Sequence, residues 1–390
     1  MNSKDKLINV LMVTGVYYPE VNGAVLQCKR IISLLEKKVY FSVLTTTKHK
    51  NLVEESVVDG VDVFRSYIGN RSAKLLQIIK ILQVFFTKKI DIVHLHGFSS
   101  RSALIVLIAK LFNKKIIVKM TSFAHDDAIS IKGKGKWFFR IFSLADVYIG
   151  ISPIFRETYL RSELDKNKYY HIPNGVNTNL FSPLTNVEEK NRLRSELGLP
   201  IDISLILVVG HFSVEKSANH VLDAWLKIHK ESDNKSGIVF IGNTDKNNFE
   251  VDNDLVNLMH SKSRDFVEDK IFFVEKTNNI EQYYQAVDIY ILPSSREGLP
   301  NALLEAMSCS LPVISTRLEG VTDWILNHKV NGMMYDYGDI DNLKMLLEDL
   351  LQDDNLCKYL GLNARKTIKD NFEISTTTEK IYDIYKDCMC

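Results

Sequence analysis

The strongest constraint on the fold is a repeated alternation of short apolar runs with helical segments. A strand buried on both faces of a parallel sheet reads as a near-continuous run of β-branched and large apolar residues. Such runs in the first half of the chain are INVLMV, FSVLTT, DVFRSY, DIVHLH, KIIVKMT and VYIGIS. Helix-period segments are expected over 24–37, 74–86, 101–112, near 135–144 and from Pro153. This alternation predicts a doubly wound parallel sheet.

The same pattern restarts in the second half, after the segment HIPNGVNTNLFSP. The later runs are SLILVVG, GIVFIG, KIFFVE, DIYILPS, PVIST and GMMYDY. We therefore expect an α/β chain of two tandem Rossmann-like domains, over 1–183 and 184–372, with a last helix over 373–390 that packs back on the first domain. Because open sheets of this type bind ligands beyond the carboxyl ends of their strands, two facing sheets would place a ligand in the cleft between them.

Composition narrows the class of protein. A chain of 390 residues is long enough for two domains. No stretch reaches the 18 apolar residues of a membrane span, and the N-terminal segment lacks the layout of a signal peptide. The five cysteines show no metal-ligand spacing, and the terminal CMC does not fit a prenylation motif. We therefore expect a cytoplasmic, reduced chain.

The two halves of the chain differ in charge. Residues 1–186 hold 27 Lys/Arg against 14 Asp/Glu, and the remaining residues hold 22 against 34. This split predicts that the first half meets something anionic. Basic-aromatic stretches over 74–89 and 132–144 are typical of segments that lie on anionic membranes. For the first stretch we favour a core helix with a charged rim; for the second, with Lys132, Lys134 and Lys136, both readings stay open.

The most specific motif is SSREGLPNALLEAM, which places Glu297 and Glu305 eight residues apart across a turn between a strand and a helix. Pro300 suits the first helical position, since its missing N–H is not needed there. The amides of Leu299 and Asn301, with the helix dipole behind them, suit a phosphate or a sugar hydroxyl. A carboxylate accepts two hydrogen bonds from a vicinal diol, as a ribose or hexose offers.

These residues carry a family resemblance. The segment YYQAVDIYILPSSREGLPNALLEAMSCSLPVISTRLEG, with NGMMYDYGD after it, resembles the C-terminal domain of retaining GT-B glycosyltransferases of family 4, the glycosyl transferases group 1. HIPNGVNTNLFSP resembles the interdomain segment of that family. The resemblance implies that Glu297 holds donor-sugar hydroxyls and Glu305 the nucleotide ribose. Gly298, Leu299, Pro300 and Asn301 would complete this part of the donor site.

Two further segments resemble phosphate-binding parts of the family. In VVGHFSVEKS, Lys216 matches the family lysine, while His211 stands where an arginine is usual and Ser217 where a glycine is usual. A histidine is a weaker phosphate ligand, because it is neutral for much of the time at pH 7. In YYPEVNGAV, Gly23 would let the backbone approach phosphates closely. The family usually has two glycines there and this chain has Asn22-Gly23, so a plain loop glycine remains the alternative.

Three histidines of the first half, His94, His96 and His125, are candidate functional residues. The family's catalytic-face histidine follows a strand in a Thr-x-His pattern, and TSFAHDD shifts His125 by two residues. His125 fills the role, or Asp126 or Thr121 replaces it. For the histidines of DIVHLHG (His94 and His96), we favour buried, satisfied side chains over a position facing the acceptor.

Metal binding is not expected. DND (Asp252–Asp254) and DID (Asp339–Asp341) match the DxD motif of metal-dependent transferases formally, but both precede helices, where Asp is a good N-cap. There is no Walker A loop, no GxGxxG after the first strand and no Ser-His-Asp candidate. We expect neither a metal nor a cofactor.

The sequence therefore predicts a metal-independent, retaining glycosyltransferase with Glu297, His125 and Lys216 as its catalytic residues. Its donor would be a nucleotide diphosphate sugar, a UDP-sugar before a GDP-sugar, and its acceptor a glycan or a lipid-linked glycan of cell-surface polysaccharide or glycolipid synthesis. We expect no binding to nucleic acid. We expect the protein to associate peripherally with the inner face of the cell membrane. The alternative is a non-catalytic nucleotide-sugar-binding subunit that scaffolds a partner enzyme. A phosphorolytic enzyme of the same fold would need a cofactor lysine, for which no motif is found.

Overall fold

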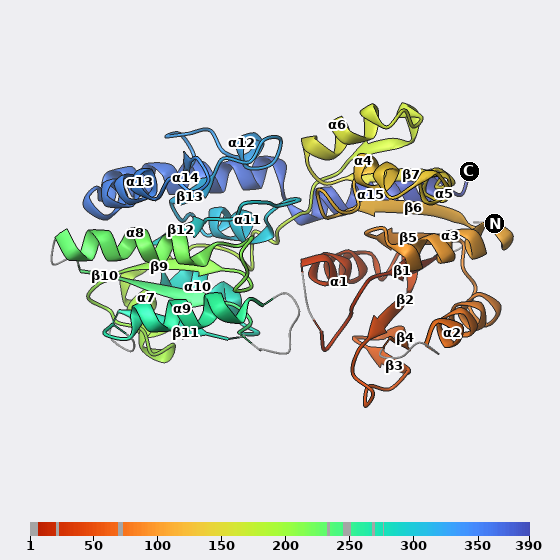
Figure 1. Cartoon of the computed structure of the whole chain (residues 1–390), viewed down its shortest axis with the longest axis horizontal. Coiled ribbons are helices and arrows are strands. Elements are labelled where there is room, and N and C mark those ends of the chain that lie inside the picture. The colour runs from red at the N-terminus through yellow and green to blue at the C-terminus, as the bar shows by residue number, and fades with distance from the viewer. Residues whose placement is uncertain are drawn as a thin grey trace, which may run out of the picture. The chain divides into compact units, whose positions relative to one another are not determined.

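The computed structural model describes residues 7–20, 23–68, 73–231, 235–244, 251–266, 270–275 and 277–390. It divides into two compact units (Figure 1). The first consists of Met1–Gly175 together with Ile374–Cys390, and the second of Val176–Glu373. Each is built on one mainly parallel sheet with helices, so the predicted α/β class with two Rossmann-like domains is confirmed.

The first unit has an eight-stranded sheet in the order β3-β4-β2-β1-β5-β6-β7-β8. All neighbours are parallel except β3 and β4. The strands are β1 (Ile8–Val13), β2 (Val39–Thr47), β3 (Glu55–Val58), β4 (Val61–Tyr67), β5 (Ile92–His96), β6 (Lys115–Met120), β7 (Val147–Gly150) and β8 (Tyr169–His171). The parallel pairing follows from the helix that connects each strand to the next.

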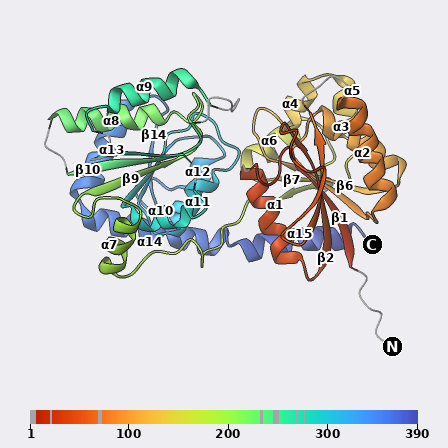
Figure 2. The same cartoon turned by 90° about the horizontal axis from the view of Figure 1, so that it is seen from below.

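The helices of the first unit lie in two layers (Figure 2). They are α1 (Gly23–Leu35), α2 (Ala73–Thr87), α3 (Ser100–Leu111), α4 (Ala128–Gly133), α5 (Lys136–Phe142), α6 (Pro153–Arg161) and α15 (Ile374–Asp387), with a short 3-10 turn η1 (Lys166–Lys168). One core cluster joins Val25 of α1, Val10 of β1 and Tyr385 of α15. The helices α2, α3 and α5 lie together on the side away from α1.

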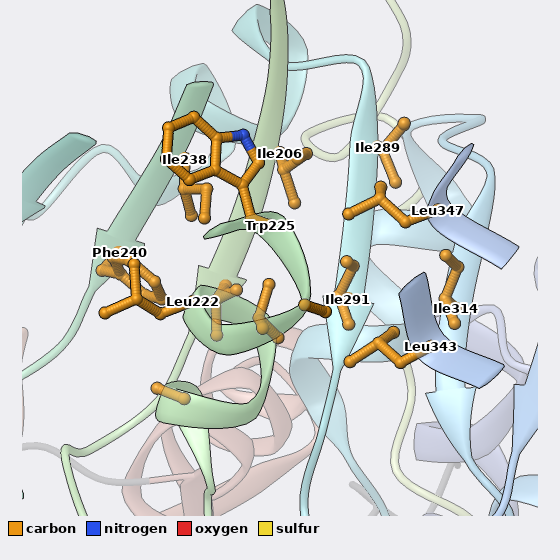
Figure 3. Close-up of a cluster of buried hydrophobic side chains, with 14 of the residues drawn as sticks. Ile206, Leu222, Trp225, Ile238, Phe240, Ile289, Ile291, Ile314, Leu343 and Leu347 are labelled. Atoms are coloured by element: carbon orange, nitrogen blue, oxygen red, sulfur yellow. The ribbon is translucent and has the colours of Figure 1, made fainter. Parts of the chain in front are cut away.

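The second unit has a six-stranded, fully parallel sheet in the order β11-β10-β9-β12-β13-β14. Its strands are β9 (Ser204–Val209), β10 (Ser236–Ile241), β11 (Ile271–Val274), β12 (Ile289–Leu292), β13 (Val313–Thr316) and β14 (Met333–Tyr335). Its helices are α7 (Val187–Glu196), α8 (Ala218–Glu231), α9 (Asn253–Ser263), α10 (Ile280–Ala286), α11 (Asn301–Ser308), α12 (Thr322–Ile325), α13 (Ile340–Gln352) and α14 (Asp354–Asn371). In its core, Trp225 and Leu222 of α8 and Leu347 of α13 pack against isoleucines of the central strands (Figure 3).

Some elements differ from those predicted. The helix expected near 135–144 is α5, while α4, which ends at Gly133, was not predicted; Gly135, with a φ of 119°, lies between the two helices. The edge strands β3 and β8 and the polar helix α7 were not predicted. No helix among the described residues is both long enough and apolar enough to cross a membrane.

Candidate donor site and its counterpart in the first unit

The second sheet reverses its strand order between β9 and β12. The chain moves outward in one direction from β9 to β11 and in the other from β12 to β14. Open α/β sheets bind ligands beyond the carboxyl ends of the strands at such a switch point. The segment that leaves β9 carries Lys216, and the segment that leaves β12 carries Glu297. Topology therefore brings two of the predicted site residues to the same edge of the sheet.

Lys216 and Glu297 form an ion pair. The Nζ of Lys216 donates to Oε1 of Glu297 at 2.5 Å. The carboxylate side chain is 10% exposed and the lysine side chain 31% exposed. A Cβ added at Gly210 would lie 3.5 Å from Cγ and Cδ of Lys216, so the aliphatic stem of the lysine covers the end of β9. The pair thus places one cation and one anion, both partly accessible, at the switch point.

A second ion pair joins the residues that immediately precede these two. One terminal nitrogen of Arg296 donates to both carboxylate oxygens of Glu215, at 2.7 and 2.8 Å. The backbone N–H of Ser295 also donates to the carbonyl of Glu215 at 2.8 Å. The two pairs have opposite polarity, since the acid lies on the β9 segment in one and on the β12 segment in the other. This double connection fixes the distance between the two segments.

Ser217 explains why a glycine is usual at its position. Its φ is 50°, in the left-handed region that glycine adopts without cost. The Ser217 hydroxyl donates to the carbonyl of Val214 at 2.6 Å and lies 3.0 Å from the hydroxyl of Tyr337. These contacts hold a non-glycine residue in that conformation at the start of α8, one residue after Lys216.

Glu305 lies inside the second unit, on α11. Its residue is 6% exposed, and the hydroxyl of Tyr284 donates to Oε2 at 3.3 Å. Burial raises the pKa of Tyr290 well above its usual value, and the charges of Glu297 and Glu305 raise it further. Tyr290 is buried on β12, and its ring lies 5.9 Å from that of Tyr284, the residue that donates to Glu305.

The start of α11 corrects one prediction. Pro300 is the N-cap, with its carbonyl accepting from the N–H groups of Leu303 and Leu304, and the helix begins at Asn301. The predicted position of Pro300 inside the helix is thus wrong by one residue, because its ψ of 96° is extended rather than helical. Leu299 is buried, and Gly298 and Asn301 are partly buried.

His211 follows β9 by two residues and is half-buried. Its backbone carbonyl accepts from the N–H of Ser213 at 2.9 Å, which turns the chain toward Lys216. The residue therefore belongs to the same segment as the lysine. It follows the carboxyl end of β9, as the sequence predicts.

In the first unit, the corresponding loop after β1 is only partly described. Gly23 is the first residue of α1 and is exposed. Asn22, its predicted partner in the phosphate loop, lies outside the described residues.

The loop after β6 separates His125 from its neighbour Asp126. His125 is exposed, and its carbonyl accepts from Nζ of Lys134 at 2.7 Å. Asp126 is buried and accepts from the N–H groups of Thr121 and Ser122 and from the Thr121 hydroxyl. Burial raises the pKa of the Asp126 carboxyl to about 6 despite these bonds. Asp126 thus holds the loop together, and His125 is the side chain that the loop presents to solvent.

His94 and His96 are buried on β5, but they are not both satisfied. The Nδ1 of His94 lies 2.7 Å from the hydroxyl of Tyr385. Neither ring nitrogen of His96 has a hydrogen-bond partner among the described residues, which corrects that part of the prediction. Burial, with the charge of Lys119 on the next strand, lowers the pKa of His94 to about 3. Lys119 is itself buried, and its pKa is lowered to about 8.

The DxD segments cap helices, as predicted. Asp252 accepts from the N–H groups of Asp254 and Leu255 at the start of α9, and Asp339 accepts from that of Asn342 at the start of α13. Within the described ranges, no three His, Cys, Asp or Glu side chains gather in a way that could hold a metal ion.

One cavity of about 340 Å³ lies on the second unit, away from the predicted site residues. Arg317, His328 and Asp349 are among the residues that line it. It includes none of the residues that the sequence assigns to the donor site.

Sequence reasoning missed Glu215, Arg296, Tyr284 and Tyr290. The first two adjoin Lys216 and Glu297, so adjacent opposite charges in EK and RE are a signal that could have found them. The two tyrosines give no such signal, because their place beside Glu305 depends on how α10 and β12 pack.

Comparison with known proteins decides the family. The family model described as "Glycosyl transferases group 1" matches residues 189–367, and "Glycosyltransferase Family 4" matches residues 21–180. Together they account for most of the chain. The second unit thus carries a group 1 glycosyltransferase domain and the first a family 4 domain, so the chain is a glycosyltransferase. The enzyme is a nucleotide-sugar-dependent transferase, and its two units are those of the GT-B fold.

Two relatives have low sequence identity to this chain but align with it over most of both lengths. This glycosyltransferase is 23% identical to N-acetyl-alpha-D-glucosaminyl L-malate synthase of Bacillus anthracis, over 80% of its own length and 78% of the relative's. It is 26% identical to the UDP-Gal:alpha-D-GlcNAc-diphosphoundecaprenol alpha-1,3-galactosyltransferase of Escherichia coli, over 80% and 79%.

Solved structures show the same fold. The sucrose-phosphate synthase of Thermosynechococcus elongatus superposes with a TM-score of 0.79 at 17% identity, covering 98% of this chain and 99% of that one. HepE of Anabaena, solved in complex with UDP-glucose, has a TM-score of 0.76 at 16% identity, covering 97% and 100%.

Proposed function

We propose that this glycosyltransferase takes a UDP-sugar as donor and transfers the sugar, with retention and without a metal ion, to a lipid-linked or glycan acceptor. The observation that carries the proposal is the ion pair of Lys216 with Glu297 at the switch point of the second sheet. One accessible cation beside one accessible carboxylate matches a substrate with an anionic diphosphate next to a polyhydroxylated ring.

In the proposed site, each residue has a separate role. Lys216 stabilises the negative charge that develops on the departing diphosphate, with help from His211. Glu297 accepts hydrogen bonds from donor-sugar hydroxyls, and Glu305 accepts them from the ribose. In the transfer step, the bond from the anomeric carbon to the diphosphate oxygen breaks and the bond to the acceptor oxygen forms. The acceptor proton passes to the diphosphate oxygen.

The preference for uridine and for a lipid-linked acceptor has support from two relatives. The Escherichia coli relative is named for UDP-Gal and a diphosphoundecaprenol acceptor, and HepE is solved with UDP and with UDP-glucose. In the first unit, we propose that exposed His125 is the residue presented to the acceptor.

The test is a panel of UDP-, GDP- and ADP-sugars assayed by thermal shift and by donor hydrolysis. A ligand that binds only the native state raises the melting temperature, by an amount that grows with its concentration over Kd. We expect the largest shift with a UDP-sugar, together with slow release of UDP. Glu297→Gln should abolish most of this release, while Glu189→Gln, on the exposed face of α7, serves as the control.

Each other outcome has a definite meaning. A larger shift with GDP- or ADP-sugars would contradict the assignment of the base. Binding without any turnover, with membrane extract added as a source of acceptor, would favour the non-catalytic subunit instead.

A further inference from the structure

We propose that the face formed by α2, α3 and α5 of the first unit docks on an anionic lipid bilayer. This inference goes beyond the proposed donor chemistry, since it rests on residues that have no part in the donor site. It begins from large apolar side chains that the three helices leave in solvent.

Each of the three helices is buried on one side and apolar on the other. On α2, Val84 and Phe85 are buried, yet Ile79 is 53% and Phe86 75% exposed. These two exposed residues are seven positions apart, so they lie on one face of the helix. Gln83, which is exposed between them and donates to a glutamate of β3, is a polar residue of this face.

The same arrangement recurs on α3 and α5. Leu107 and Leu111 of α3, four residues apart, are 41% and 84% exposed. Trp137 in the first turn of α5 is 77% exposed, while Phe142 of that helix is buried. A single exposed apolar residue needs no explanation, but aligned pairs on α2 and α3 together with Trp137 of α5 form a patch of the kind that marks an interaction surface.

Contacts place the three helices in one layer. The ring of Phe86 on α2 lies 5.0 Å from that of Phe112, which ends α3. Phe98, just before α3, lies 5.3 Å from Phe138 of α5. Figures 1 and 2 show all three helices on the same side of the first unit, away from α1. The exposed apolar residues thus share one face.

Charge identifies the occupant of this face. The three helices contain no acidic residue. Lys89, Lys136 and Arg140 are exposed and make no ion pair with a described acidic side chain, and Arg140 lies over the ring of Trp137 at 5.8 Å. Lys132 and Lys134 are less available, because they bind Glu163 and the carbonyl of His125.

A bilayer fits this combination better than a second copy of the chain does. In a symmetric dimer through this face, the same cations would meet each other and repel. Acids from other elements pair with Lys80 of α2 and Lys110 of α3. Lys136 and Arg140, the exposed cations of the helix that carries Trp137, have no such partner among the described residues. Aromatic and aliphatic side chains among such cations are typical of segments that lie in the headgroup layer of anionic membranes. Trp137, with cations around it, suits that layer in particular.

The experiment is co-sedimentation with vesicles of phosphatidylcholine alone or with phosphatidylglycerol, at low and high salt. Two variants test the two components: Phe86→Ser/Leu111→Ser/Trp137→Ser for the apolar face, and Lys89→Gln/Lys136→Gln/Arg140→Gln for the charge. A matched control is Met345→Ser/Leu362→Ser, two similarly exposed apolar residues of the second unit. All three should melt like the wild type, since every replaced side chain is exposed.

We expect binding to anionic vesicles only, weakened by high salt because the Debye length shortens. The charge variant should bind roughly a hundredfold more weakly, at about fivefold for each cation. The apolar variant should lose roughly tenfold for each side chain, and the control should bind like the wild type. Addition of anionic vesicles should also shift Trp137 fluorescence to the blue, a change that Trp137→Phe removes.

Three outcomes would overturn the proposal: no binding to anionic vesicles, equal binding to both vesicle types, or unchanged binding of the apolar variant. Self-association in the absence of lipid that Trp137→Ser abolishes would also overturn it, in favour of a dimer. Binding of soluble UDP-sugar, measured in parallel, should be the same for all variants. Failure of the docking face is therefore distinguishable from failure of the proposed donor site.

Discussion

The two units share a sheet topology but differ in the charged groups at the carboxyl ends of their central strands. In the second unit, Lys216 and Glu297 are ion-paired and partly accessible. In the first, His94 and Lys119 are buried, and desolvation lowers the pKa of both. The same topology therefore supplies the position of a ligand site, while local solvation decides whether the position keeps its charge.

The largest expected effect follows from removing the charges of Lys216 and Glu297 in the second unit. Lys216→Met and Glu297→Gln should each lower donor turnover about tenfold to a hundredfold, because a hydrogen bond to a charged group contributes about 1.5–3 kcal/mol. The double variant should melt close to the wild type, since it leaves no unpaired charge, yet should remain inactive. Turnover and melting temperature are measured on all three. Recovery of turnover in the double variant would show that the pair serves only the fold.

We expect an effect of intermediate size when the pH is lowered, on the stability of the first unit. The pKa values of His94 and His96 are lowered by burial, so the folded state holds them neutral while the unfolded state gains protons below about pH 6.5. Stability is therefore present above that pH and is lost as the pH falls, by about 2 kcal/mol for His94 between pH 6.5 and 5. Asp126 acts in the opposite direction, since its pKa is raised to about 6.

Hydrogen exchange at several pH values checks this, with peptides of the second unit as the internal reference. His94→Phe, made in a Tyr385→Phe background so that no hydroxyl loses its partner, should flatten the pH dependence of the first unit. Tyr385→Phe alone should leave it unchanged. Lys119 and Tyr385 are titratable groups beside these rings, and Cys28 interacts electrostatically with both of them. If Tyr385→Phe alone and His94→Phe in the Tyr385→Phe background showed the same pH dependence of exchange, the role of His94 would be contradicted.

The smallest effect concerns the second ion pair, Glu215 with Arg296. Breaking it loosens the two segments without removing a residue that touches substrate, so Glu215→Gln and Arg296→Gln should each lower kcat/KM about tenfold, chiefly through KM. The double variant should lose no more than either single one, because residues of one pair are not additive. Neutralising Lys227 and Asp341, an exposed pair of the same unit, is the control. Additive losses would mean that Glu215 and Arg296 act separately.

The sequence predicts the central strands of both sheets and the edge strands of the second sheet, but it misses the two edge strands of the first sheet. β1 was predicted at its observed bounds, Ile8–Val13, because a strand buried on both faces leaves an apolar run, interrupted here only by Asn9. β3 alternates exposed and half-buried residues at the edge of the sheet and gives no such signal. α7 is mostly polar, and its place depends on Arg194, which donates to the carbonyl of Ala286 and to Asp288. Contacts of this kind form only when distant segments meet.

The candidate site divides in the same way. Lys216, Glu297 and Glu305 could be selected from motif spacing and from their place after predicted strands. The pairing of Glu215 with Arg296 joins residues 81 positions apart, and only the folded sheet brings them together. The sequence also could not predict that the ring nitrogens of His96 lack hydrogen-bond partners among the described residues. Whether a buried ring is hydrogen-bonded depends on every element packed around it.

The placement of α15 has a consequence for synthesis on the ribosome. Ile381, Ile384 and Tyr385 of this helix complete the core that α1 and β1 begin, so the first unit is assembled from the two ends of the chain. All of the second unit emerges before those residues do. The part made later can thus fold first, while the part made first waits with the α15 portion of this core uncovered. A nascent chain stalled near residue 373 would present that apolar surface to chaperones, and a fragment that stops at residue 175 would not be a folded domain.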